Sequence, residues 1–388
     1  MNTGNKRELH SASPNSSEGG ALKRRRLASS ACPVATEDVC SERISQKPLR
    51  KMLDFSQSPM DDTEGIFTEI AHSLLNDHRL SVRTEDSTTE YDFMEVEFYL
   101  YRPGCHEDPF THRSHEQQQA GQWYFHRAPR RSGTEQPLKA QGSGYRGGTR
   151  KGLDLTIGVS PETTSTENSQ TTHTRGGILL RTLRRVSDKK IISGPSLLVD
   201  EILRASRAKS ITELVTARLH GDISAFSAPI GGATDSVPHL RLVHVQSSTG
   251  RSKLRVFRSP RIGLDLSNPE IPREDPRQHP RVQFVAKPYR YFVHPHLLTA
   301  NGRGQTFLGV YRQCADRNHL DSHDDFIEEI VRLTGLKPQT TKNYLAEYRG
   351  GLERGQLKIF LGTAGKGASA TPTTFLRMMG TLAKLEPQ

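Results

Sequence analysis

Residues 91–101 are Tyr-Asp-Phe-Met-Glu-Val-Glu-Phe-Tyr-Leu-Tyr, and this stretch decides the fold class. In an extended chain, successive side chains point to opposite faces. One face would therefore carry Met94, Val96, Phe98 and Leu100, and the other Phe93, Glu95, Glu97 and Tyr99. The pattern predicts a strand with one apolar, buried face. The opposite face mixes carboxylates with aromatic rings, which favours the wall of a cleft over a surface in bulk water.

Helical and extended patterns flank this strand. Apolar side chains at helical spacing predict a helix that begins near residue 64; they are Phe67, Ile70, Ala71, Leu74 and Leu75. Further strands are expected at residues 123–126, 153–158 and 178–180, with closing strands at 260–263 and 288–293. The turn at residues 193–196, Ser-Gly-Pro-Ser, predicts the start of another helix.

The composition excludes several classes of protein. The chain has 388 residues, with 54 Lys and Arg against 43 Asp and Glu, and its formal net charge of +11 favours polyanionic partners. No apolar run approaches the roughly 18 residues of a membrane-spanning helix, and no secretory signal is visible at the N-terminus. The four cysteines are scattered and form no CxxC pair, so we expect a reduced intracellular protein.

Both ends of the chain differ in character from its middle. Residues 1–60 are rich in Ser, Pro and charge and are expected to form a disordered basic tail. The run Lys-Arg-Arg-Arg at residues 23–26 is either a nuclear address or a solvated charge cluster. Residues 318–388 are expected to form a small helical C-terminal appendage, in which two short helices around Gly335 suit a helical hairpin or a helix-turn-helix. Polar inserts are expected near residues 128–150, 160–175 and 265–281.

Two groups of residues carry plausible chemistry. Glu97 and Tyr99 would lie side by side on one face of their strand, where a carboxylate can activate a water molecule and a ring can stack on a planar substrate. Asp108-Pro109 and then His112 follow in the next loop. The second group is the apolar strand that ends in Arg181, followed by the Ser-Gly-Pro-Ser turn.

Taken in order, these segments resemble the methylpurine (alkyladenine) DNA glycosylase family. The similarity runs from residue 64 to about residue 300 and includes two later segments, Pro-Arg-Ile-Gly at 260–263 and Lys-Pro-Tyr-Arg-Tyr-Phe-Val at 287–293. The resemblance implies an α+β domain with a curved, mostly antiparallel sheet and flanking helices, of the kind also seen in formyltransferase C-terminal domains. It also implies a monofunctional enzyme that flips a damaged purine out of duplex DNA and hydrolyses its N-glycosidic bond.

The same resemblance implies a role for individual residues. Glu97 falls at the position of the general base that deprotonates the attacking water, and Arg181 at that of an arginine that supports the water and a phosphate. Tyr99 and His112 fall at positions that stack on or hydrogen-bond the flipped base. The resemblance implies no metal and no cofactor. The partner it implies is double-stranded DNA, and the protein is expected to be a monomer that does not bind a membrane.

The chain also departs from the family pattern. His126 occupies the position of a second stacking tyrosine, and Asp154 that of an asparagine that faces the pocket. A carboxylate there would repel phosphate unless Arg146, Arg150 or Lys151 neutralised it. The aromatic wedge that fills the gap left by a flipped nucleotide has no clear match.

Basic residues between 127 and 151 suit either phosphate contacts or a solvated loop; they are Arg130, Arg131, Arg146, Arg150 and Lys151. The histidines near residues 106–126 lack the spacing of a known zinc motif.

On the strength of the resemblance, the leading hypothesis is a nuclear DNA glycosylase. A DNA-binding protein without catalytic activity, built on the same scaffold, is the alternative, and an interaction protein whose charge serves only solubility is a third.

Overall fold

The computed structural model describes residues 48–56, 59, 62–128, 144–160, 173–226, 237–245, 253–316 and 323–385, all within one compact unit that spans residues 47–388. The basic tail, including residues 23–26, lies almost entirely outside the described residues. Much of the inserts expected near 128–150 and 160–175 also lies outside them, and so do Arg130 and Arg131.

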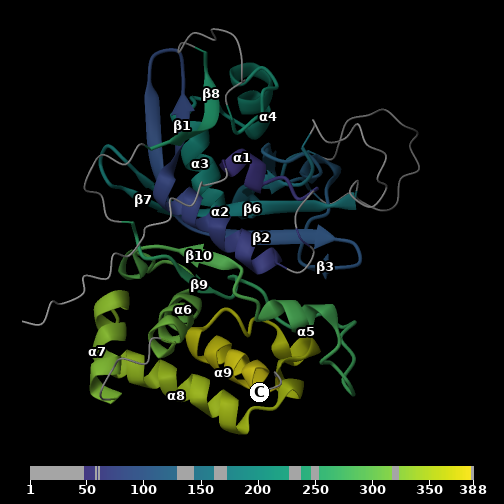
Figure 1. Cartoon of the computed structure of the whole chain (residues 1–388), viewed down its shortest axis with the longest axis vertical. Helices are drawn as coiled ribbons and strands as arrows, with labels where there is room; N and C mark the ends of the chain where they lie inside the picture. Colours follow the sequence, from purple (N-terminus) through teal and green to yellow (C-terminus); the bar gives the residue numbers. More distant parts are fainter. Residues whose placement is uncertain are drawn as a thin grey trace, which may run out of the picture. The chain divides into compact units, whose positions relative to one another are not determined.

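Helices and strands are mixed along the described chain (Figure 1). The strands are β1 (His78–Arg83), β2 (Thr88–Arg102), β3 (His106–Glu107), β4 (Trp123–Phe125), β5 (Leu153–Ile157), β6 (Arg175–Arg185), β7 (Ile191–Ser193), β8 (His239–His244), β9 (Phe257–Ser259) and β10 (Arg290–Phe292). The α-helices are α1 (Leu49–Met52), α2 (Thr63–Asp77), α3 (Pro195–Ala205), α4 (Ile211–Glu213), α5 (Pro280–Val285), α6 (Arg303–Ala315), α7 (His323–Thr334), α8 (Pro338–Arg354) and α9 (Pro372–Ala383).

The described strands form one ten-stranded sheet in which every pairing between them is antiparallel. Its main path runs β4-β5-β6-β2-β1-β8, and β10 joins β2 to β9. The sheet curls into a half-barrel with helices packed against it (Figure 1). The expected mixture of helices with a curved antiparallel sheet is therefore confirmed.

The strand that decides the fold is longer than expected, and both of its faces are largely buried. Helix α2 begins at Thr63, where the side chain of Asp62 caps it by accepting from the amide of Gly65. The apolar residues predicted from helical spacing are all buried in it, and Phe67 stacks on Phe98 of β2 with ring centroids 4.5 Å apart. On the opposite face of β2, Glu97 has no solvent exposure whereas Tyr99 is partly exposed, so this face is interior at Glu97 and reaches solvent at Tyr99.

The C-terminal helices begin earlier than expected and pack on the sheet. The helical pair around Gly335 is present, since α7 ends before this residue, which has φ of 68°, and α8 begins at Pro338. Helix α6, however, precedes the predicted boundary at residue 318 and lies against β9. A Cβ on Gly309 of α6 would lie 2.7 Å from the carbonyl oxygen of Arg258, so glycine permits this close approach. The region is part of the same compact unit.

Candidate active site

Strands β2 and β6 bring two carboxylates and an arginine together through an irregular register. Glu97 pairs with Leu179, but Glu95 pairs with Thr182, so β6 has one extra residue between the two pairs. That residue is Arg181. A β-bulge of this kind turns neighbouring side chains toward the same face. Both Arg181 and Thr182 therefore contact the carboxylates, although regular alternation would send them to opposite faces.

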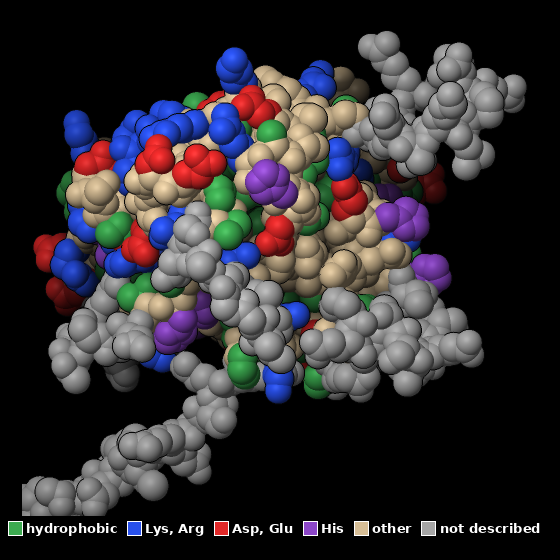
Figure 2. Space-filling view, turned by 90° about the horizontal axis from the view of Figure 1, so that it is seen from above, with side chains coloured by type: hydrophobic (Ala, Val, Ile, Leu, Met, Phe, Trp, Pro, Cys, Tyr) green, Lys and Arg blue, Asp and Glu red, His purple; other side chains and the backbone are tan. Residues whose placement is uncertain are grey.

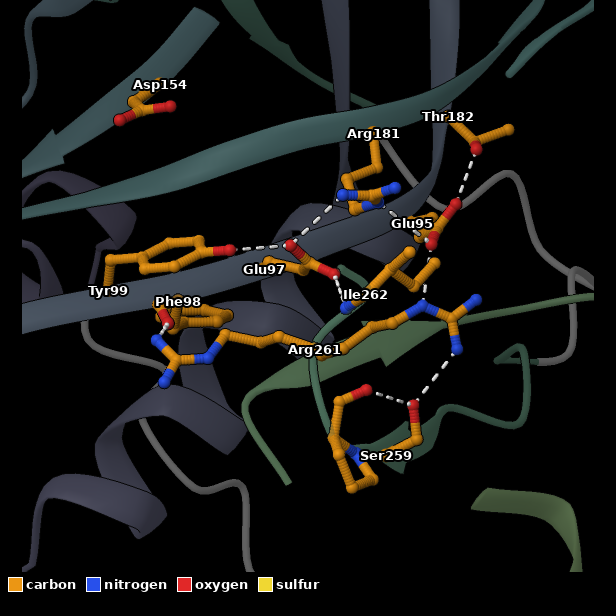
Figure 3. Close-up of polar contacts among 12 residues, drawn as sticks. Glu95, Glu97, Phe98, Tyr99, Asp154, Arg181, Thr182, Ser259, Arg261 and Ile262 are labelled. Atoms are coloured by element: carbon orange, nitrogen blue, oxygen red, sulfur yellow. Dashed lines mark hydrogen bonds and ion pairs between the residues drawn. The ribbon is translucent and has the colours of Figure 1, made fainter. Parts of the chain in front are cut away.

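Glu97 is fully buried and is held by donors from three segments (Figure 3). Its Oε1 accepts from the backbone N–H of Ile262 at 2.7 Å. Its Oε2 accepts from the Tyr99 hydroxyl at 2.9 Å and from Nη1 of Arg181 at 3.3 Å. An ionised carboxylate offers about four acceptor positions. Donors of the described residues fill three of them, so one acceptor position is unfilled.

The Pro-Arg-Ile-Gly segment is fixed in place by a buried ion pair. The guanidinium of Arg261 bonds both carboxylate oxygens of Asp108, at 2.5 and 3.2 Å, and neither side chain is exposed. The same guanidinium also donates to the carbonyl of Phe98 at 3.0 Å and lies 4.5 Å from the ring centroid of Tyr99. These contacts explain why the next residue, Ile262, presents its N–H to Glu97.

Tyr99 keeps its hydroxyl proton near neutral pH. Burial raises its pKa well above the usual value of 10, and the negative charge of Glu97 raises it further, against the opposing charges of Arg261 and Arg181. The hydroxyl therefore remains protonated and donates to the carboxylate. Since Arg261 lies over the ring of Tyr99, only the other face of that ring is left for a planar ligand.

Glu95 is a second buried carboxylate, which our sequence analysis did not assign to the site. Its Oε1 accepts from Nε of Arg290 at 2.6 Å, and its Oε2 accepts from the Thr182 hydroxyl at 2.5 Å. Burial alone would raise the pKa of Glu95, but the charges of Arg290 and Arg181 and the bond from Thr182 outweigh burial and lower it. Glu95 is therefore ionised and serves as a fixed counter-ion. Its period-two spacing from Glu97 was the signal that could have found it.

The expected base-contacting residues form a neighbouring cluster. Nε2 of His126 lies 2.8 Å from Oδ1 of Asp154, and Nε2 of Gln117 donates to Oδ2 at 3.1 Å. The ring of His112 lies beside that of His126, with centroids 4.3 Å apart. The two departures from the family pattern, His126 and Asp154, thus contact each other. The contacts of the Asp154 carboxylate come from His126 and Gln117, and no hydrogen bond or ion pair of the described residues joins it to Arg146, Arg150 or Lys151.

His112 lies at the solvent side of this cluster and is held in its neutral form. Partial burial of the ring, together with the charge of His126, lowers its pKa to about 4, although the residue is in part exposed to solvent. At neutral pH the imidazole can therefore donate with one ring nitrogen and accept with the other. Among the contacts of the described residues, His112 makes no hydrogen bond to Glu97 or Tyr99. The predicted site residues therefore form two clusters and not one.

The two clusters nevertheless lie on one face of the sheet. Glu97 is opposite Leu179, which is opposite Asp154, which is opposite Tyr124. Directly opposed residues project to the same face, and strands are spaced about 4.8 Å apart, so the Cα atoms of Glu97 and Asp154 are about 10 Å apart. Figure 3 shows Asp154 on the far side of β6 from Glu97. A substrate that spans both clusters would be the size of a nucleotide.

Gly177 of β6 packs closely against Asp154 and Gln117. A Cβ at this position would lie 2.7 Å from Oδ2 of Asp154 and 2.9 Å from Nε2 of Gln117. Any larger residue would therefore displace one of these groups. This contact gives a physical reason for the Gly-Gly pair at the start of β6.

The basic residues near this face differ in how free their charges are. Lys151 forms an ion pair with Asp200, so its charge is largely compensated. Arg150 ends a short 3-10 helix, η2 (Gly148–Arg150), and is exposed. Arg146 donates to the carbonyl of Arg127 at 2.9 Å, and its charge acts on His112. Arg146 and Arg150 are therefore the described candidates for phosphate contacts.

The end of the molecule that carries β1, β8 and α4 shows a different distribution of charge. Figure 2 views this end and shows Lys and Arg side chains next to Asp and Glu. Ion pairs here join Arg207 to Asp86 at 2.6 Å and Arg241 to Asp222 at 3.1 Å. The charges of these two arginines are therefore at least partly compensated within the chain.

Within the described part of the chain, no three His, Cys, Asp or Glu side chains are grouped so that they could hold a metal ion. The same residues include no helix long and apolar enough to span a bilayer.

No model of a known protein family matches this chain. The chain is 27% identical over 205 residues to an uncharacterized protein of Acanthamoeba polyphaga mimivirus. The matched region covers 53% of this chain and 81% of the viral protein. The viral protein is uncharacterized, so this similarity assigns no activity to the chain.

Proposed function

We propose that this chain is a divergent relative of the methylpurine DNA glycosylases that hydrolyses the N-glycosidic bond of a flipped, alkylated or deaminated purine. The observation that carries the proposal is the buried carboxylate of Glu97, which has one acceptor position left and a guanidinium beside it. A half-barrel sheet that places an aromatic ring and a histidine cluster on the same face supports it. The order of the sequence motifs is the second support.

The proposed reaction needs only water and the side chains of this face. Glu97 takes a proton from a water molecule as the water oxygen forms a bond to C1′ of the sugar. The bond from C1′ to the base nitrogen breaks, and its electron pair leaves with the base. A cationic alkylated purine takes up this pair by losing its positive charge, whereas a neutral base such as hypoxanthine takes up a proton from water as it leaves. Arg181 donates to the carboxylate of Glu97 at 3.3 Å and so orients it.

The cluster of His112, His126 and Asp154 is the proposed contact for the flipped base. Neutral His112 can donate to or accept from the base edge. His126 holds the carboxylate of Asp154 through a 2.8 Å contact, which fixes its orientation beside the proposed base site. The exposed side chain of Arg150 and the nearby Arg146 are the proposed phosphate contacts in duplex DNA.

A base-release assay tests this function. Duplexes with a single hypoxanthine, ethenoadenine or methylated purine are incubated with excess protein, and free base is measured over time. We expect release by the wild-type chain and a loss of at least about a hundredfold in Glu97→Gln, the lower range for removal of a general base. Glu90→Gln is the matched control, because Glu90 lies on the same strand and pairs with Arg79 outside the site.

The alternative functions predict different results. Salt-dependent binding to DNA without base release from any duplex would favour the DNA-binding protein without catalytic activity. Absence of binding even at low salt would favour the interaction protein. Activity in Glu97→Gln equal to that of Glu90→Gln would refute Glu97 as the base.

We also propose that the protein acts in the nucleus and as a monomer. Localisation of the tagged chain tests the first point, and sedimentation tests the second.

A further inference from the structure

Glu95 lies between two arginines, and this position links it to the reactivity of Glu97. Its Oε1 is 2.6 Å from Nε of Arg290 and 3.4 Å from Nε of Arg181. Arg181 in turn reaches Glu97 at 3.3 Å. Opposite charges attract strongly in a site that excludes water. Glu95 and Glu97 both attract Arg181. Because Arg290 balances the charge of Glu95, it weakens the pull of Glu95 on Arg181 and leaves Arg181 directed at Glu97.

Arg290 is anchored from three elements at once. It is fully buried on β10, and its Nε bonds Glu95 of β2. Its Nη1 donates to the hydroxyl of Ser259 on β9 at 3.0 Å, and its Nη2 donates to the hydroxyl of Thr306 on α6 at 3.0 Å. The position of the guanidinium therefore depends on a helix from the C-terminal region as well as on the sheet.

The packing of α6 makes this dependence stiff. Thr306 lies in the first turn of the helix and is 4% exposed. One turn further on, Gly309 approaches the backbone of β9 so closely that a side chain would not fit. A shift of α6 would therefore be transmitted to the hydroxyl of Thr306 and from there to Arg290.

We propose that Arg290 and Thr306 are positioning residues. Through them, the C-terminal helices keep the charge of Glu95 balanced by Arg290 and keep Arg181 directed at Glu97. The effect on catalysis rests on the proposed glycosylase function, whereas the linkage from Thr306 to Arg181 does not. Neither residue contacts the carboxylate of Glu97. The helices after residue 302 are on this view part of the catalytic unit.

Thr306→Val tests the linkage with little change in volume, because it removes the hydroxyl and keeps the branched side chain. Thr341→Val is the matched control, since Thr341 is a fully buried threonine of α8 whose hydroxyl has no hydrogen-bond partner among the described residues. Thr306→Ser restores the hydroxyl and should rescue the wild-type behaviour. Two measurements are made on each full-length variant.

The first measurement is the ¹⁵N NMR signal of the Arg181 side chain, assigned with Arg181→Lys. We expect it to shift in Thr306→Val and to stay in place in Thr341→Val and Thr306→Ser. The second is base release. We expect kcat to fall about tenfold in Thr306→Val with KM within about twofold, because the bond touches no substrate. The acid limb of the pH–rate profile should move to higher pH, since a carboxylate with less cationic support holds its proton more tightly.

The outcomes separate the two claims. A shifted Arg181 signal in Thr306→Val, together with a wild-type chain that releases no base, would support the linkage and reject the glycosylase function. An Arg181 signal in Thr306→Val that matches Thr341→Val would overturn the linkage, whatever the activity. An active wild type whose kcat and pH profile are the same in both valine variants would overturn the positioning role.

Discussion

Asp154 and His126 are predicted to stabilise the fold as a coupled pair. Their side chains are 3% and 10% exposed, and the contact between Nε2 and Oδ1 is 2.8 Å. Removal of one partner leaves the other buried without its hydrogen bond, which costs roughly 1–3 kcal/mol. The double variant has no such orphan. We therefore expect the coupling free energy of Asp154→Ala and His126→Ala to be about 1–3 kcal/mol.

A double-mutant cycle measures this coupling. The free energy of unfolding in urea is determined for the wild type, both single variants and the double variant. Arg207 and Asp86 form the comparison pair, since their contact is 2.6 Å long but their side chains are 61% and 63% exposed. Such exposed pairs contribute less than about 1 kcal/mol. A coupling for Asp154 and His126 no larger than that of the exposed pair would refute the reasoning.

Two further predictions concern the same face. Gly177→Ala should destabilise the chain by roughly 1–3 kcal/mol and weaken base release, because its Cβ would meet the carboxylate of Asp154, whereas Gly147→Ala, which meets nothing within 4 Å, should stay within about 0.5 kcal/mol in urea unfolding. Equal stabilities of the two variants would contradict this. His112 has its folded pKa lowered from 6.5 to about 4, so the unfolded chain binds the extra proton first and stability should fall as the pH drops from about 6.5 to about 4. His112→Gln should flatten this part of the stability curve, and an unchanged curve would show that His112 does not contribute.

Local periodicity predicted the parts of the fold that depend on neighbours in sequence. The helix with Phe67 and Leu74 follows from helical spacing, and the pairing of Glu97 with Tyr99 on one face follows from the period of a strand. Turn chemistry predicted that a helix follows the Ser-Gly-Pro-Ser turn, where α3 begins at Pro195. In each case the interaction lies within a few residues, so a short stretch of sequence contains all the information.

Long-range contacts explain what the sequence could not predict. Arg290 reaches Glu95 across 195 residues, and Arg261 reaches Asp108 across 153 residues. Neither partner is specified by spacing, because the pairing depends on the register of the sheet. The bulge at Arg181 is set in the same way, since it appears only when β6 is aligned with β2. The contact between His126 and Asp154 required the hairpin of β4 and β5.

The charge balance of the buried face bears on why such a network exists. Three carboxylates, Glu95, Glu97 and Asp108, face three guanidiniums in the described interior. Removing six charges from water is costly, and apolar residues that fill the same volume often stabilise a protein as well or better. Stability alone therefore gives no reason to keep this arrangement. A buried carboxylate with one acceptor position unfilled is suited to the activation of a water molecule, so the cost in stability is itself an argument for chemistry at Glu97.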